Sequence, residues 1–531
     1  MKKGLLVIIG LLAAFLLQAA GPFEADWKAV REARVKGLPR TATNVLARIE
    51  TKARELKAWP DLAAVFVERA RLAYGFTEES ALKKEGPQGL VAQFAAEIET
   101  APAEVRPMLR LALVRNYLSM SHSMRYWQGR RTQIAGAAQT NQPPWSVERL
   151  RPTLQKLLRQ ILDDAPFLQT ANPDDWRNLL ESANEFGRAV MPTLYDFAVE
   201  EFVSFIGENH LVDRADDGTP TGLAADVLAA LDANIAFHAN DADRTAFAYA
   251  KFQRIDFVDL FAVAPLKEKT AKRRKAFEAL AEEFFTQTWV SALAAERAGR
   301  LRAEEGCDLV DLHAYYLRFA DKWPRMPGGD ACRLAAQKLE IPSLSLQTER
   351  NWMAPWPDLK IVYKNLSRVS FRLVKIDVDD LAKDLEFDFS PYGHREGIEK
   401  HFARKPVRTW TVDVPPKSDY KVHSHTVKVP SDLPKGHYLL FASSDETFNI
   451  KVRRPLPIFQ TLVTVTDLAL VTDETRGRFS GFVFNAETGR PVADAKVELW
   501  TRDRRAYRRT ETVKTADDGS FEIAKSNVYG G

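Results

Sequence analysis

Apolar positions follow two different periods along this chain, and the change between them lies near residue 341. In the first part they recur at intervals of three and four residues, which places them on one face of a helix. The clearest such series consists of Ala42, Val45, Leu46, Ile49, Ala53 and Leu56. We therefore expect residues 21–341 to form an α-helical domain.

The helical stripes are interrupted in a way that predicts helix–turn–helix pairs. Gly37-Leu38-Pro39 ends a first short helix, and Pro327-Gly328-Gly329 separates a stripe ending at Phe319 from one resuming at Cys332. Glycine and proline both stop helices. The pairs resemble tetratricopeptide-like repeats, but no fixed repeat length relates them. We prefer an irregular all-α domain to a regular solenoid, and either offers a surface for an envelope partner.

From residue 342 onward, apolar and polar residues alternate instead. Val369, Phe371 and Leu373 alternate with polar neighbours, which is the period of a half-buried strand. Further strands are expected at residues 409–414, 424–429 and 438–442. Short strands separated by turn residues are typical of an antiparallel β-sandwich. The fold class is therefore α+β and multidomain.

Two prolines, Pro455 and Pro457, suggest where one sandwich ends and another begins. We expect a first sandwich over 342–455 and a second over 456–531, with Leu462, Val463 and Val465 in its first strand. The second sandwich is expected to be incomplete at its C-terminal end. We expect residues 1–20, which precede the helical domain, to be a signal peptide.

The N-terminus predicts export. Lys2 and Lys3 precede an apolar run over residues 5–17, and Ala19, Ala20 and Gly21 follow, which is the form of a secretory signal. The residues around the expected cleavage point match the preferred pattern only in part. The alternative that this segment is not cleaved and serves as a membrane anchor therefore stays open. We expect a periplasmic or extracellular protein, in contact with a membrane only if that segment is kept.

The charge balance does not favour nucleic acid as a partner. The formal net charge is +4 over 531 residues, from 75 Lys and Arg against 71 Asp and Glu. The basic runs at 267–275 and 502–509 are interrupted by other residues and are typical of solvated faces. No continuous basic stripe is present to follow a phosphate backbone.

The chain has two cysteines, Cys307 and Cys332. In an oxidising compartment an even pair favours a disulfide. The same two residues also fit as buried thiols that face each other across a helix pair, and the sequence leaves both alternatives open. A metal site would need further ligands, and no CxxC or suitably spaced histidine accompanies them.

We find no enzyme motif: HExxH, GxSxG, a P-loop and GxGxxG are all absent. His122 stands between Ser121 and Ser123, but adjacent residues on a helix do not face each other. The spacing of His394, Glu396 and His401 differs from that of a zinc motif. We therefore assign no catalytic, cofactor-binding or metal-binding residue, and we expect the chain not to be an enzyme.

Two further polar groups are also explained without a metal site. His423 and His425 project to one side of an expected strand, and two ligands seldom hold a metal, so we expect a surface strand. An acidic group lacks the glycine and the terminal glutamate of a calcium loop and is expected to be a solvated connection. Its members are Asp377, Asp379, Asp380 and Asp384.

Three stretches of the β region together resemble bacterial alpha-2-macroglobulin-like proteins, specifically their N-terminal part. They are the run 433–440 (LPKGHYLL), the run 465–470 (VTDLAL), and the segment 480–500 (SGFVFNAETGRPVADAKVELW) with Asp517-Asp518-Gly519-Ser520-Phe521. Trp27, Gly37-Leu38-Pro39 and the run 341–346 are similar to the variety with a long helical leader. The resemblance implies helices followed by macroglobulin β-sandwich domains.

The resemblance implies a function in trapping proteases. In that family a protease cuts a bait segment, and the molecule changes shape around it. Many members carry a thioester in Cys-Gly-Glu-Gln, which is absent here. We expect this chain to be the N-terminal part of an endopeptidase inhibitor, with the bait and thioester regions elsewhere. The alternative is an exported binding module, because the motif around Gly489 and Pro491 also occurs in carboxypeptidase-regulatory-like and transthyretin-like sandwiches that could hold an envelope component or carbohydrate.

Overall fold

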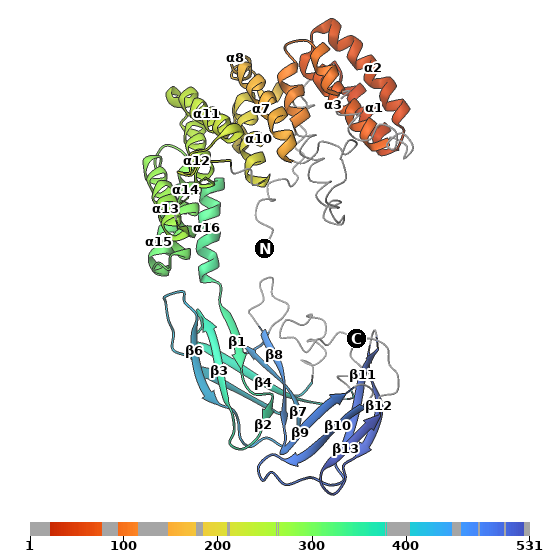
Figure 1. The fold of residues 1–531 in the computed structure, drawn as a ribbon. Coiled ribbons are helices and arrows are strands. Elements are labelled where there is room, and N and C mark those ends of the chain that lie inside the picture. The colour runs from red at the N-terminus through yellow and green to blue at the C-terminus, as the bar shows by residue number, and fades with distance from the viewer. Residues whose placement is uncertain are drawn as a thin grey trace. The chain divides into compact units, whose positions relative to one another are not determined.

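The computed structural model has helices in its first part and strands in its second, as the change of period predicts (Figure 1). It describes residues 22–76, 94–114, 147–176, 184–209, 213–261, 263, 265–377, 379, 404–448, 458–475, 478–503 and 506–524. The last labelled helix ends at Glu340 and the first strand begins at Ser343. The fold is therefore α+β.

The labelled helices all precede residue 341. They are α1 (Glu24–Val35), α2 (Pro39–Leu56), α3 (Trp59–Phe76), α7 (Val147–Asp163), α8 (Ala165–Leu168), η1 (Pro173–Trp176), α9 (Glu185–Val190), α10 (Leu194–Asn209), α11 (Gly222–Phe237), η2 (His238–Asn240), α12 (Thr245–Asp259), α13 (Leu266–Glu283), α14 (Val290–Glu304), α15 (Leu309–Lys322) and α16 (Pro327–Glu340). Together with the strands they divide into two compact units. One consists of residues 1–306 and 316–333, and the other of residues 307–315 and 334–531.

Helix α2 shows why this part of the sequence is helical. Its predicted apolar stripe is buried from Ala42 to Ala53, and Pro39 stands in the first turn, where its missing N–H costs nothing. Gly37, with a φ of 67°, makes the preceding turn. The exception in the predicted stripe is Leu56, which is 57% exposed at the end of the helix.

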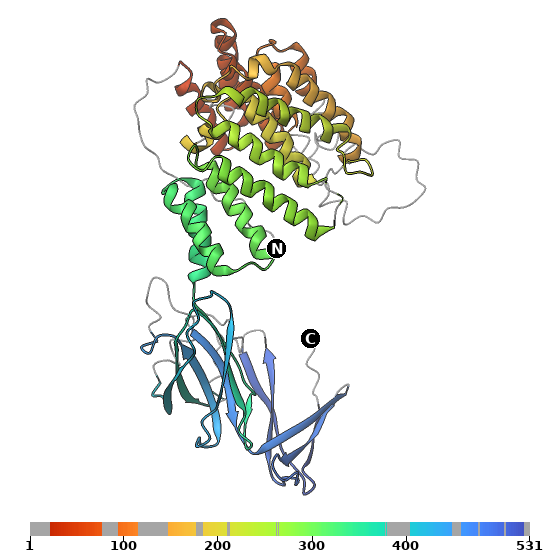
Figure 2. The same cartoon turned by 90° about the vertical axis from the view of Figure 1, so that its left-hand side faces the viewer.

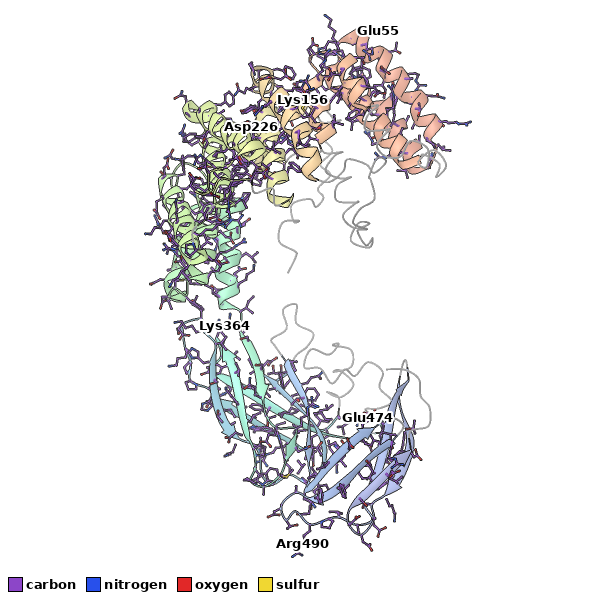
Figure 3. The ribbon with its side chains drawn as sticks, viewed as in Figure 1. Glu55, Lys156, Asp226, Lys364, Glu474 and Arg490 are labelled. Atoms are coloured by element: carbon purple, nitrogen blue, oxygen red, sulfur yellow. The ribbon has the colours of Figure 1, made fainter. Side chains whose placement is uncertain are left out.

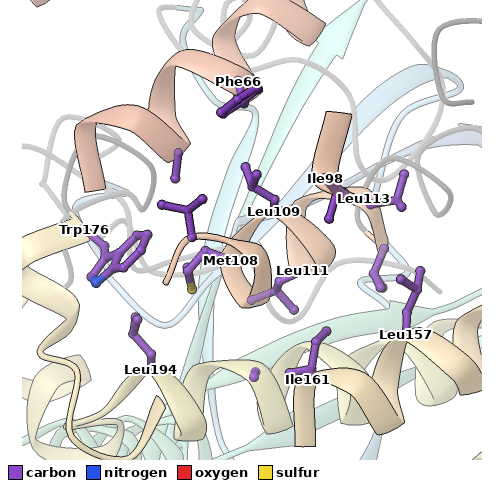
Figure 4. Close-up of a cluster of buried hydrophobic side chains, with 14 of the residues drawn as sticks. Phe66, Ile98, Met108, Leu109, Leu111, Leu113, Leu157, Ile161, Trp176 and Leu194 are labelled. Atoms are coloured by element: carbon purple, nitrogen blue, oxygen red, sulfur yellow. The ribbon is translucent and has the colours of Figure 1, made fainter. Parts of the chain in front are cut away.

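A continuous apolar core joins the N-terminal helices to those that follow. Figure 4 shows part of it, with Phe66 of α3, Leu109, Ile161 of α7 and Leu194 of α10. Further along, Gly299 of α14 allows the ring of Tyr316 to approach closely. A Cβ at this glycine would lie 2.4 Å from that ring, so any larger residue would push α15 away.

Within the described residues, the strands form four sheets. They are β1 (Ser343–Gln347), β2 (Asn351–Trp352), β3 (Asp358–Lys364), β4 (Arg368–Ile376), β5 (Arg408–Asp413), β6 (His423–Lys428), β7 (Gly436–Ser443), β8 (Ile458–Val465), β9 (Leu468–Thr475), β10 (Arg478–Asn485), β11 (Lys496–Asp503), β12 (Ala506–Lys514) and β13 (Ser520–Ala524). The three strands predicted at 409–414, 424–429 and 438–442 correspond to β5, β6 and β7.

The first sandwich packs a three-stranded sheet, β1-β3-β6, against a five-stranded sheet, β2-β8-β7-β4-β5 (Figure 2). Its core includes Trp352, Ile361, Phe371 and Leu440, all no more than 1% exposed. The prediction that Leu462, Val463 and Val465 begin a second sandwich is wrong. They belong to β8, which pairs antiparallel with β7 from Gly436 to Ser443 and completes the first sandwich.

The second sandwich consists of the sheet β13-β10-β9 and the hairpin β11-β12. Val483, Phe521 and Ile523 form its core, against which Val497 and Leu499 of the hairpin pack. Gly489 has a φ of 68° and makes the turn after β10, as the motif Thr488-Gly489-Arg490-Pro491 predicts. Pro491 then pairs with Phe484 in an isolated bridge.

Candidate functional site

The two cysteines are thiols in the structure and are not bridged to each other. Cys332 lies on α16 with no exposed surface, and its Sγ donates a hydrogen bond to the Ala292 carbonyl at 3.2 Å. Burial, together with the charge of Glu296, raises the pKa of the Cys332 thiol to about 12. Cys332 is therefore held as a neutral, unreactive part of the helical core.

The two histidines of β6 lie on the same side of the strand, as predicted, but that side is the inner one. His425 is opposite Ile361 and His423 is opposite Tyr363, and both histidines are half-buried. His423 Nε2 lies 2.8 Å from Asp419 Oδ1, and this contact lowers the pKa of Asp419. β6 is thus an edge strand with one exposed face, and the two histidines lie on its half-buried face.

The other predicted polar groups yield no metal centre in the part of the chain that is described. The backbone N–H of Asp379 donates to Asp377 Oδ1 at 2.9 Å, which is a local turn. Within the described ranges, no group of three or more His, Cys, Asp or Glu is arranged to hold a metal. The remaining residues, which lie outside the described ranges, are Ser121, His122, Ser123, Asp380, Asp384, His394, Glu396 and His401.

The basic run at 267–275 lies on α13, and three of its six basic side chains, Lys269, Arg273 and Arg274, pair with carboxylates. Arg273 pairs with Asp256 and Asp259, and Arg274 Nε lies 2.8 Å from Glu305 Oε2. These pairs connect α13 with neighbouring segments of the helical region. These three side chains of the run are therefore part of an ion-pair network.

A buried polar cluster at α10 and α11 was not anticipated from the sequence. Asp196, 3% exposed, accepts hydrogen bonds from the Thr193 hydroxyl at 2.7 Å and from Asn234 Nδ2 at 3.0 Å. His238, 1% exposed, lies with Nε2 2.8 Å from Asp196 Oδ1 and Nδ1 2.6 Å from Asp241 Oδ2. Both ring nitrogens are thus occupied, which suits a structural cross-link better than proton transfer to a substrate.

The charge state of His238 follows from this geometry. Burial disfavours the imidazolium ion, but the hydrogen bonds and charges of Asp196 and then Asp241 outweigh it and raise the pKa of His238 above 6.5. Asp196 and His238 are 42 residues apart in the sequence, so no local pattern could have identified the pair.

The C-terminal end of α16 is held by the first sandwich. Asn365 Nδ2 donates to the Leu339 carbonyl at 2.8 Å, and Lys364 Nζ donates to the Lys338 carbonyl at 3.2 Å (Lys364 is labelled in Figure 3). These carbonyls belong to the last turn of the helix and have no acceptor role within it. Burial lowers the pKa of Lys364.

A second contact fixes the same end of α16. His313 Nε2 lies 2.7 Å from Glu340 Oε1, and the His313 ring stacks on Tyr420 with 4.7 Å between ring centres. Tyr420 follows Asp419, the partner of His423. The loop before β6 therefore contacts both histidines, His313 through a ring and His423 through a carboxylate.

The outer face of the second sandwich carries exposed apolar side chains. Phe482 is 43% exposed and Val471, directly opposite on β9, is 56% exposed. Phe482 also stacks with Phe484 at 5.9 Å between ring centres. A hollow of ≈ 690 Å³ lies beside them, lined by residues of β9, β10, β13 and 514–516.

Charged side chains of both signs border this hollow: Lys514, Asp473 and Glu522. Asp473 of β9 and Glu522 of β13 lie opposite the same residue, Ser480 of β10. Glu522 is paired with Arg478 at 3.0 Å. The hollow thus combines apolar side chains with charged side chains of both signs.

Comparisons with known proteins add little to this description. No family model matches the chain, and no curated protein matches it. One solved structure with similarity is native alpha-2-macroglobulin from Escherichia coli spanning domains NIE-MG1, at 14% identity and a TM-score of 0.28 over 35% of this chain and 88% of that chain. Another spans domains MG0-NIE-MG1, at 14% identity and a TM-score of 0.27 over 35% of this chain and 58% of that chain. Among the described helices, none is long and apolar enough to span a bilayer.

Proposed function

We propose that this chain is the N-terminal part of an exported protease-trapping protein of the alpha-2-macroglobulin type. The observation that carries the proposal is the way the resembling stretches fold. The run 433–440 leads into β7, the run 465–470 joins β8 to β9, and the run 480–500 forms β10, its turn and β11. Each stretch thus supplies a strand or a connection of a β-sandwich that follows a helical region, in the order that the resemblance implies.

In this proposal the chain acts as a scaffold and a recognition surface. The helical region and the sandwiches present stable surfaces to an envelope partner or to another part of the inhibitor. Cleavage of bait and closure around the protease belong to other regions of the protein. The target is an endoprotease, and the compartment is the periplasm or the extracellular space.

The test uses the natural full-length product of the gene, incubated with a panel of endoproteases. Trapping predicts that cleavage of a large protein substrate stops, whereas cleavage of a small chromogenic peptide continues, because only the small substrate reaches an enclosed active site. Catalytically inactive protease is the control, since it cannot cut a bait. Residues 21–531 alone should leave both reactions unchanged.

Two results would contradict the proposal. Equal loss of both activities would indicate a conventional inhibitor that blocks the active site. Full activity on both substrates would favour the alternative, an exported module that holds an envelope component or carbohydrate. Sequencing the N-terminus of the mature protein addresses export separately, because removal of residues 1–20 distinguishes a cleaved signal from an anchor.

A further inference from the structure

Strand β9 is the edge of its sheet on one side. It pairs with β10 along its whole length, from Leu468 opposite Asn485 to Thr475 opposite Arg478. Among the strands of the described residues, none pairs with its other side. Figure 1 shows β9 beside β10, and Figure 3 labels Glu474 near the end of β9.

The neighbouring hydrogen bonds identify which backbone groups of β9 face outward. Val483 N–H donates away from β9, to the Gly519 carbonyl at 2.8 Å, whereas Ala486 N–H donates to the Asp467 carbonyl at 2.7 Å. Backbone groups alternate between the two sides of a strand. The odd-numbered residues of β9 therefore bond to β10, and the N–H and C=O groups of Leu470 and Thr472 point to the open side.

The side chains of β9 indicate that its inner face is also uncovered. Leu470 lies directly opposite Val483, so both point to the inside of the sandwich. Val483 is 5% exposed, but Leu470 is 58% exposed, and Leu468 on the same face is 43% exposed. The hairpin covers β10 and β13 and leaves these two leucines open. An added strand beside β9 would cover both.

Charge defines the chemistry of that strand. Asp473 is exposed, and within the described residues no ion pair involves it. Glu474 follows it on the same strand, so the C-terminal end of β9 is acidic while its N-terminal half is apolar. A complementary segment therefore carries a lysine or arginine at one end and apolar side chains at the other.

We propose that β9 is a docking strand that takes up an extended segment of another polypeptide by strand addition. Antiparallel pairing is favoured per residue and matches the rest of this sandwich. The segment then has its basic residue near its N-terminus, beside Asp473, and its apolar residues over Leu470 and Leu468. This inference does not depend on the protease-trap proposal, because it rests on the edge of one sandwich.

The experiment measures binding of a fluorescein-labelled peptide to the full chain by fluorescence polarisation. The probe has a lysine near its N-terminus, followed by alternating valine and threonine. Thr472→Pro removes an outward N–H without disturbing the bonds to β10, and proline is tolerated at such edge positions. Thr472→Val keeps the N–H and is the matched control. Circular dichroism of both variants establishes that they fold alike.

We expect saturable binding to the wild type and to Thr472→Val, with affinity at least about tenfold lower for Thr472→Pro. A peptide N-methylated at alternate residues should lose at least about as much affinity. It keeps its side chains, but it cannot donate the backbone hydrogen bonds to β9. Asp473→Lys should weaken binding by about fivefold, less at high salt.

Three results would overturn the proposal. Equal affinity of the proline and valine variants would exclude the edge as the binding site. Equal binding of the N-methylated peptide would mean that side-chain contacts alone are responsible. Self-association that Thr472→Pro abolishes, without any peptide binding, would assign the edge to a second copy of this chain instead.

Discussion

The first and second sandwiches place similar apolar strands in opposite environments. In the first, β7 lies between β4 and β8, and it is buried from Tyr438 to Ser443. In the second, β9 has a neighbour on one side, and Leu470, Val471 and Thr472 are exposed. The difference teaches that an apolar strand acquires a closed core only from its neighbours in space, not from its own composition.

The closed strand is covered on both faces. Tyr438, Leu440 and Ala442 belong to the core between the two sheets, while Leu439 and Phe441 belong to a separate cluster on the other face of the five-stranded sheet. Burial on both faces is usual for central strands that read as continuous apolar runs. On β9, by contrast, apolar side chains on both faces remain open to solvent.

The largest expected effect is the contrast between two leucine truncations. Leu440→Ala should lower the free energy of unfolding of the first sandwich by about 3 kcal/mol, because it leaves a cavity in a fully buried core. Leu470→Ala, the matched control, should cost less than about 1 kcal/mol. Hydrogen exchange resolved by peptide gives both values. Equal costs would mean that the inner face of β9 is covered after all.

Amide exchange within β9 should show an alternation that β7 lacks. We expect the N–H groups of Leu470 and Thr472 to exchange on the order of a hundredfold faster than that of Val471, because the outward groups have no ladder partner. In β7 both sides of the strand are bonded, so neighbouring amides should be protected alike. Residue-resolved exchange by NMR measures this, and uniform protection along β9 would show that a further strand already covers the edge.

The buried polar cluster of the helical region extends the comparison to polar groups. Its side chains, unlike the open edge of β9, all have hydrogen-bonding partners. His238→Ala should destabilise the packing of α10 on α11 by about 2 kcal/mol, since Asp196 stays buried and loses a hydrogen-bonding partner. Truncation of the half-buried His425, the control, should cost less. Local hydrogen exchange in α10 and α11 reports the loss.

The same cluster predicts a direction of pH dependence. The folded-state pKa of His238 is raised above the ordinary 6.5, so the contribution of the charged ring is complete below 6.5. It is lost as the pH rises through the folded pKa. Thermal melts of the wild type should therefore lose stability over this range relative to His238→Gln, which does not titrate. The opposite slope would mean that the ring is neutral when folded.

The smallest effect concerns two glycines with open space around them. Gly489→Ala should destabilise the second sandwich by about 1 kcal/mol, because its φ of 68° is unfavourable for alanine. Gly207→Ala lies inside α10, where it should stabilise the helix by about 0.5 kcal/mol or more. Thermal denaturation compares the two. Changes of the same sign would argue against the turn after β10.

Local periodicity was sufficient to predict where helices give way to strands. The stripe from Ala42 to Ala53 and the alternation from Val369 to Leu373 are properties of single elements, and both are present in the structure. That β8 belongs to the first sandwich could not be predicted in the same way. Whether Val463 pairs backward with β7 or forward with β9 depends on contacts between strands, which alternation does not encode.

The candidate surfaces were harder to predict than the fold. Leu468 and Leu470 have the composition of a buried strand, and only the topology shows that their side of the sandwich is open. His238 depends on Asp196, 42 residues earlier, and on Asp241, three residues later. The sequence identified His423 and His425 as facing the same way, but it could not say that the inner face of the sandwich lies on that side.

The capped end of α16 has a practical consequence for anyone who wishes to produce the sandwiches by themselves. Cutting the chain at residue 342, where strands begin, would remove the carbonyls that accept hydrogen bonds from Asn365 and Lys364. It would also remove His313, which stacks on Tyr420, and its partner Glu340. In the truncated product, the side chains of Asn365, Lys364 and Tyr420 would lose these partners. A recombinant piece that starts at residue 307 keeps these partners, but it uncovers Tyr316 and Cys332, which pack against Gly299 and Ala292 of α14.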